Sequence, residues 1–109
     1  MSDPAKIERL ASLQTRLLWF TDLLSRAMAT GPSDQVVHVS VALRRISGTL
    51  NLVKQAQSTM MSDKPSVDEL RQIVDNLQTS LETLQSVGRT DIPLGELRSM
   101  TEEVKALAA

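Results

Sequence analysis

Apolar residues recur at alternating steps of three and four along three long stretches of this chain. This spacing keeps side chains on one side of a helix with about 3.6 residues per turn, so each stretch is predicted to be an amphipathic helix. An average step of about 3.5 also favours left-handed packing between nearly parallel helices. The three stripes are Leu10, Leu13, Leu17, Phe20, Leu24 and Ala27; Val36, Val39, Leu43, Ile46, Leu50 and Val53; and Val67, Leu70, Val74, Leu77, Leu81 and Leu84.

Further apolar residues flank each stripe and widen it. A wide apolar face suits a helix that contacts two neighbours, which favours a bundle over an isolated two-stranded coil. The flanking residues are Leu18, Leu23 and Met28; Ala42, Ala56 and Met60; and Ile73 and Val87.

The first two helices are predicted over about residues 3–30 and 34–61. Asp3 can accept the free amide protons of the first turn, and Pro4 stands where a missing N–H costs nothing. Gly31-Pro32 is predicted to end the first helix, because glycine tolerates the left-handed closing conformation and proline disfavours a helical residue before it.

Two features of the second helix need an interpretation. Residues 36–41 are mostly β-branched and could form a strand if taken alone, but the stripe that continues through Val53 favours a helix. Gly48 lies in the middle of this helix, where it costs about 1 kcal/mol relative to alanine. We interpret it as a site of close helix packing rather than as a functional hinge.

The last two helices are predicted over about residues 66–87 and 93–107. Ser66 and Glu69 form a capping-box pattern, in which each side chain is expected to bond the backbone N–H of the other residue. Gly88 is expected to be the left-handed cap of the third helix.

The predicted fold is therefore all-α. It is an up-down-up bundle of three long helices with coiled-coil-like packing and a shorter C-terminal fourth helix, forming one domain over residues 1–109. The fourth helix could fold over the open end or lie in the groove between two of the others.

Composition narrows the function classes. The absence of cysteine excludes disulfides, thiolate metal sites and a thiol nucleophile. A net charge of −1 with both signs interspersed predicts neither a nucleic-acid partner nor an acidic-lipid partner. No apolar run approaches the roughly 20 residues of a membrane span, and polar residues 2–9 stand where a secretory signal would need an apolar run, so we expect a cytoplasmic protein.

No catalytic, metal-binding or cofactor-binding motif is found, so we expect neither an enzyme nor a cofactor. His38 is the only histidine and lacks a second ligand at helical spacing, which predicts a solvated residue rather than a metal ligand. Glu102 and Glu103 are adjacent on a helix and diverge by about 100°. Histidine phosphotransfer domains carry a phosphorylatable histidine before Leu-Lys-Gly, but in the nearest segment here Arg44 replaces the histidine and Ser47 the lysine.

Charge differs between two sequential helices. The second helix carries a net +2, from Arg44, Arg45 and Lys54 against Asp34, and the third carries −3. We interpret these charges as flanking the interface of the two helices and helping to set their pairing.

Trp19 is predicted to lie beside the first apolar stripe, because its neighbour Phe20 lies on that stripe. It shares its side of the helix with Arg16 and Leu23. It either packs at the core edge against the fourth helix or forms an exposed patch that binds another chain, since tryptophan and arginine are enriched at interface hot spots.

The expected function is a non-enzymatic protein–protein interaction module: a small helical adaptor, chaperone or scaffold subunit. We expect the chain to form a homo-oligomer whose interface buries the stripes of the first two helices, or to be a subunit of a helical assembly. The alternative is a helical signalling or regulatory domain. The predicted partner-binding residues, on the side of the first helix and on the fourth helix, are Arg16, Trp19, Leu23, Leu94, Leu97, Met100, Val104 and Leu107.

Overall fold

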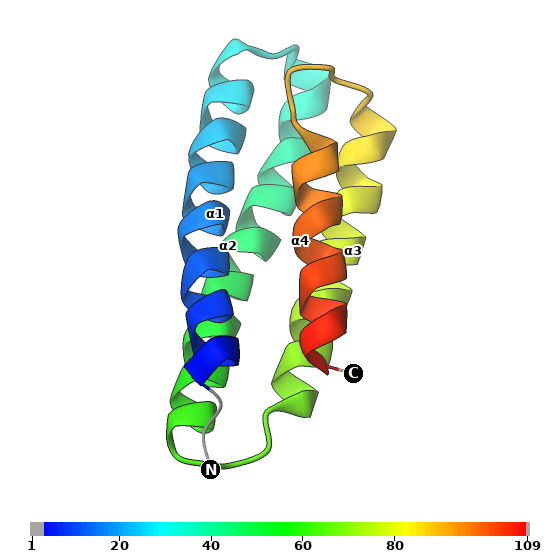
Figure 1. Cartoon of the computed structure of the whole chain (residues 1–109). Coiled ribbons are helices and arrows are strands. Elements are labelled where there is room, and N and C mark those ends of the chain that lie inside the picture. The colour runs from blue at the N-terminus through cyan, green and yellow to red at the C-terminus, as the bar shows by residue number, and fades with distance from the viewer. Residues whose placement is uncertain (1–3, 109) are drawn as a thin grey trace.

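A computed structural model describes residues 4–108, and these residues form four helices and no strand. The helices are α1 (Pro4–Thr30), α2 (Ser33–Met61), α3 (Val67–Val87) and α4 (Leu94–Ala108). They alternate in direction along the long axis of a rod measuring 49 × 20 × 17 Å (Figure 1). The predicted all-α fold is confirmed, and residues 36–41 are helical as expected.

Each helix contributes one line of buried residues to a common core. In α1 this line is the predicted stripe, all of it buried. In α2 and α3 the centre is shifted by about one position, so that Thr49 and Ser80 are fully buried while Val67 is 40% exposed. Small residues, namely Ala42, Thr49 and Ala56, alternate with larger ones along the buried line of α2. The buried line of α3 is leucine and isoleucine apart from Ser80. Leu18 does not widen the core as expected and is 53% exposed.

The helix ends follow the sequence only in part. Pro4 begins α1 as predicted, whereas its expected cap Asp3 lies outside the described residues. Gly88 ends α3 at φ +70°, which is the predicted left-handed cap. The capping box is wrong: Ser66 makes no side-chain capping bond. Glu69 instead accepts a hydrogen bond from the Thr59 hydroxyl of α2 at 3.1 Å, so its side chain joins two helices rather than two turns of one.

Two glycines have roles other than those predicted. Gly31 is not left-handed, since Gly88 is the only described glycine with a positive φ. A methyl group on Gly31 would collide with the guanidinium of Arg89, so space rather than backbone conformation requires glycine there. Gly48 is exposed, and apart from the adjoining residues of α2 no atom lies within 4 Å of the position where its Cβ would be. The interpretation of Gly48 as a close packing site is therefore wrong.

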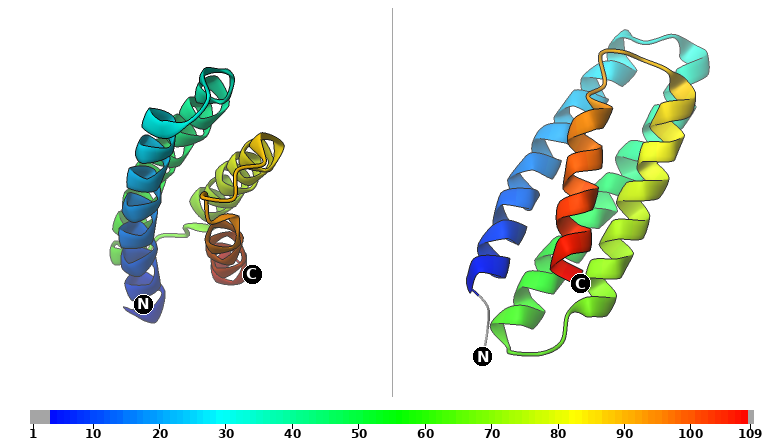
Figure 2. Two further views of the ribbon diagram at one scale, coloured as in Figure 1. Left: turned by 90° about the horizontal axis from the view of Figure 1, so that it is seen from above. Right: turned by 45° about the vertical axis from the view of Figure 1, so that its right-hand side comes forward.

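The fourth helix lies lengthwise on the bundle. It runs antiparallel to α3, and Leu97, Met100, Val104 and Leu107 are at most 4% exposed (Figure 2). Helices that are consecutive in sequence pack closest, namely α1 with α2, α2 with α3 and α3 with α4. The backbones of α1 and α4 lie farther apart than those of these three pairs, and we call the line between them the α1–α4 seam.

Candidate partner-binding surface

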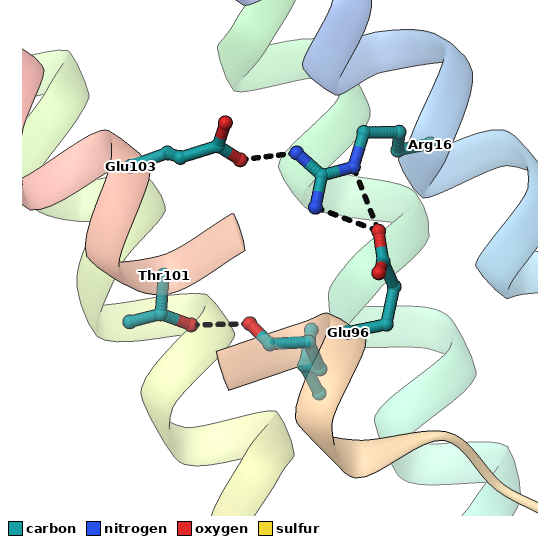
Figure 3. A network of polar contacts seen from close by, with 5 residues as sticks. Arg16, Glu96, Thr101 and Glu103 are labelled. Atoms are coloured by element: carbon teal, nitrogen blue, oxygen red, sulfur yellow. Dashed lines mark hydrogen bonds and ion pairs between the residues drawn. The ribbon is translucent and has the colours of Figure 1, made fainter. Parts of the chain in front are cut away.

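Arg16 bridges the seam between α1 and α4 (Figure 3). Its Nε and Nη2 donate to one oxygen of Glu96 at 2.7 and 2.6 Å, and its Nη1 donates to Glu103. Glu96 and Glu103 lie seven residues apart, which is close to two helical turns, so both side chains lie on the side of α4 that faces α1. One guanidinium thus holds two turns of α4. We call this group the Arg16 clamp.

The clamp is also electrostatically well matched. Partial burial disfavours the charged form of Arg16, but the hydrogen bonds and charges of Glu96 and Glu103 outweigh that effect and raise the pKa of Arg16. The side chain of Arg16 is 28% exposed, so water screens the contact only in part. The positive charge at this seam is therefore permanent.

A second tether lies at the end of the same seam. Arg89, in the linker between α3 and α4, donates through Nη1 to the Ala27 carbonyl of α1 at 2.6 Å. Asp91 orients the guanidinium through two parallel hydrogen bonds at 2.9 and 2.5 Å. The Arg89 side chain is 14% exposed and lies in the space that Gly31 leaves free.

The contact with Arg89 changes the pKa of Asp91. The hydrogen bonds from Arg89 lower the pKa of Asp91, and its desolvation opposes this only in part. The sequence pattern assigns no role to residues 89–92, which lie between the third and fourth predicted helices. The available signal was an Arg-x-Asp pair directly after the left-handed Gly88, because this spacing allows a bidentate contact within one loop.

The two tethers bracket the residues predicted to bind a partner on α1. Trp19 and Leu23 lie between Arg16 and Ala27, and Trp19 is 51% exposed although its neighbour Phe20 is fully buried. Leu23 is partly buried. The structure therefore brings Arg16, Trp19 and Leu23 together along the seam, with their side of α1 accessible.

The predicted partner-binding residues of α4 are placed differently. Leu94 is partly buried and packs against the core, and the other four belong to the core itself. A partner can reach these four side chains only if α4 leaves the bundle. A partner of the intact bundle would contact Trp19, Leu23 and Arg16.

Two further features of the described surface are hollows. A hollow of about 60 Å³ lies lower in the α1–α4 seam, between Leu13 and Leu107. A hollow of about 300 Å³ lies between α3 and α4 beside Arg71 and Lys105. Within residues 4–108 no group of three or more His, Cys, Asp or Glu side chains could hold a metal ion, and no helix is long and apolar enough to span a bilayer. His38 is exposed on α2.

No protein-family model matches this chain, and no curated protein and no solved structure matches it. Its function is therefore inferred from its own residues.

Proposed function

We propose that this chain is a non-enzymatic protein-binding module whose binding surface is the α1–α4 seam around Trp19. The observation that supports this proposal is the exposure of Trp19 between two polar tethers. A tryptophan buries more apolar area than other side chains when a partner covers it, and its indole N–H remains available for a hydrogen bond. Leu23 and the stem of Arg16 extend the apolar surface along the same side of α1.

The chemistry of the seam favours a helical partner. An amphipathic helix could lie beside α4 with apolar residues on Trp19 and Leu23, in the helix-in-groove mode. It could also replace α4, which has 15 residues and is the shortest helix of the bundle. Isolated helices of about that length are marginal in water, so α4 depends on its contacts with the bundle. An adaptor, a chaperone or a subunit of a helical assembly would use such a surface.

Site-specific photo-crosslinking tests this proposal. A photoreactive amino acid in place of Leu23 should join the full chain to a defined partner in the cells that make it. The same probe in place of the exposed Ala29 is the matched control and should not. Trp19→Gln should weaken binding of the partner by about thirtyfold, because loss of a hot-spot residue costs about 2 kcal/mol or more. Equal capture by both probes, or capture that Trp19→Gln leaves unchanged, would rule out this surface.

A further inference from the structure

A hollow of about 400 Å³ lies between α2 and α3, which are not the helices that form the α1–α4 seam. We call it the α2–α3 groove. Apart from the adjoining residues of α2, no atom lies within 4 Å of the position that a Cβ on Gly48 would occupy. Another backbone could therefore approach α2 closely at this point. The groove is lined by Val41, Arg44, Arg45, Gly48 and Asn76.

The charged side chains that line this groove are both positive. They are Arg44, which is exposed, and Arg45, which is partly buried. Neither guanidinium forms an ion pair within the described residues. The groove therefore presents two adjacent positive charges that are available to another molecule.

The acidic residues of α3 lie on another side of that helix. Asp75 lines the hollow between α3 and α4, beside Lys105. Asp68 and Glu82 are each seven residues from Asp75, close to two helical turns, so they share its side of α3. Within the described residues, helices α2 and α3 form no ion pair with each other. Their opposite charges thus do not set their pairing, contrary to the interpretation from sequence. The contribution of α3 to the groove is Asn76, a neutral amide.

The α2 side of the groove is part of an exposed stripe along that helix. Val37 is 66% exposed and Val41 is 41% exposed, and Arg44 and Gly48 follow them as exposed residues. The four residues are separated by steps of four, three and four, which is the spacing at which a second helix packs along a first. The stripe is about 17 Å long, or about three turns. It is apolar at one end and basic towards the other.

We propose that the α2–α3 groove binds an acidic amphipathic helix of another protein. The apolar residues of this helix lie on Val37 and Val41, and its backbone passes over Gly48. Its carboxylates pair with Arg44 and Arg45, whose planar guanidinium groups bind carboxylates through two parallel hydrogen bonds. Charge complementarity supports an acidic partner over a neutral or basic one. The open space over Gly48 supports close contact between two helices.

Three synthetic peptides of about 18 residues test the proposal, with the full chain as the receptor. All three are amphipathic helices with the same leucine face, and they differ only in carrying Glu, Gln or Lys beside that face. In fluorescence anisotropy at about 0.1 M salt, the Glu peptide should bind at least about tenfold more tightly than the Gln peptide, and the Lys peptide more weakly than both. The advantage of the Glu peptide should shrink at about 1 M salt, because salt screens exposed charges.

Variants of the full chain locate the binding. Arg44→Glu and Arg45→Glu should each weaken binding of the Glu peptide by roughly tenfold, because like charges then meet. Gly48→Leu should abolish most of the binding, since the new side chain fills the space that the partner backbone needs. Lys54→Glu is the matched control, because it changes the net charge equally on an exposed residue of α2 that does not line the groove. It lies about 14 Å along the helix from Arg45, beyond the screening length of about 10 Å, and should change binding by less than about twofold.

Several outcomes would overturn the proposal. Equal binding of the Glu and Gln peptides would show that the arginines attract no carboxylate. Binding that neither arginine variant weakens would place the peptide on another face, and equal weakening by Lys54→Glu would indicate attraction to net charge alone. Trp19→Gln should leave the Glu peptide bound as tightly as before, so this proposal and the partner surface around Trp19 can fail separately. Circular dichroism checks that each variant is folded.

Discussion

At the scale of single residues, the core contains hydroxyl groups, and most of them donate a hydrogen bond within their own helix. Thr49 and Thr101 are buried, and each hydroxyl donates to the carbonyl four residues earlier at 2.8 Å (Figure 3 shows Thr101). This local bond satisfies the buried hydroxyl without a partner from another helix. Ser80 is fully buried and its hydroxyl has no protein partner. The two threonines therefore fit the buried centres of α2 and α4, whereas the unpaired hydroxyl of Ser80 leaves α3 with a desolvation cost.

Gly31→Ala is expected to destabilise the protein by about 1 kcal/mol. The new methyl group displaces the Arg89 guanidinium, and the lost hydrogen bond to the Ala27 carbonyl is worth roughly 1.5–3 kcal/mol as a bond from a charged donor. Lower entropy of the unfolded chain offsets about 0.4–1 kcal/mol of that loss. Urea unfolding followed by circular dichroism gives the difference.

Two further variants check the cause of this effect. Gly48→Ala meets open space on an exposed helix surface, so it should raise stability by roughly 0.5–1 kcal/mol. If Arg89 is responsible, Gly31→Ala should cost less in an Arg89→Ala background than alone. Full additivity of the two changes would place the cost elsewhere.

The Arg89–Asp91 contact should lose its contribution to stability in acid. The pKa of Asp91 is lowered below its ordinary value of 3.8, so the folded state favours the carboxylate. This contribution is complete above the unfolded pKa and is lost as pH falls through the folded pKa. The stability difference between wild type and Asp91→Asn should therefore shrink as pH falls below about 4. Thermal midpoints of both proteins between pH 3 and 7 measure it, and an unchanging difference would contradict the assignment.

At the scale of helices, periodicity and turn residues predicted the elements well. All four helices start and end within about one residue of the predicted bounds, because proline, glycine and the long stripes act locally. The capping box failed because Glu69 has a competing partner, Thr59, that is ten residues away in sequence and close in space. The placement of α4 was left open between two positions. The apolar face of α4 suited either position. The packing of the other three helices decides that α4 lies lengthwise in the groove rather than over the open end.

Among the helices, α4 is expected to open most readily. Its contact with α1 is the loosest in the bundle and relies on the Arg16 clamp. Arg16→Met keeps the apolar stem and removes the charge, at a cost of about 1 kcal/mol for a partly shielded pair of ionic contacts. If this cost falls on local opening of α4, amide exchange of residues 94–107 should accelerate roughly fivefold. Hydrogen-exchange mass spectrometry resolves this segment.

Arg26→Met is the matched control for this experiment. Arg26 pairs with Asp22 within α1, and its side chain is 74% exposed. Its substitution should leave exchange in residues 94–107 unchanged. Protection of α4 equal to that of α1–α3, unaffected by Arg16→Met, would show that α4 is a fixed part of the core. A partner that replaces α4 would then be excluded, whereas one that lies beside it on Trp19 would not.

At the scale of the whole molecule, the surface of the bundle differs in chemistry from one pair of helices to the next. The α1–α4 seam is closed by polar tethers around an exposed tryptophan. Asp75 of α3 lies instead beside Lys105 of α4, in the hollow between those two helices. The stripes of α1 and α2 that suggested self-association in the sequence lie largely in the core, so a partner of the intact bundle would contact other side chains.

The sequence by itself determined the helices, their order and direction, and most of the core, because these follow from periodicity and from glycine and proline acting over a few residues. It also singled out Arg16 and Trp19 beside the first stripe. The tertiary structure decided contacts between residues distant in sequence: Arg16 with Glu96 and Glu103, Arg89 with Ala27, and the space over Gly31. These contacts depend on the register and rotation of each helix against its neighbour. A repeat of three and four leaves both open, since several flanks of a broad apolar stripe can face the core equally well.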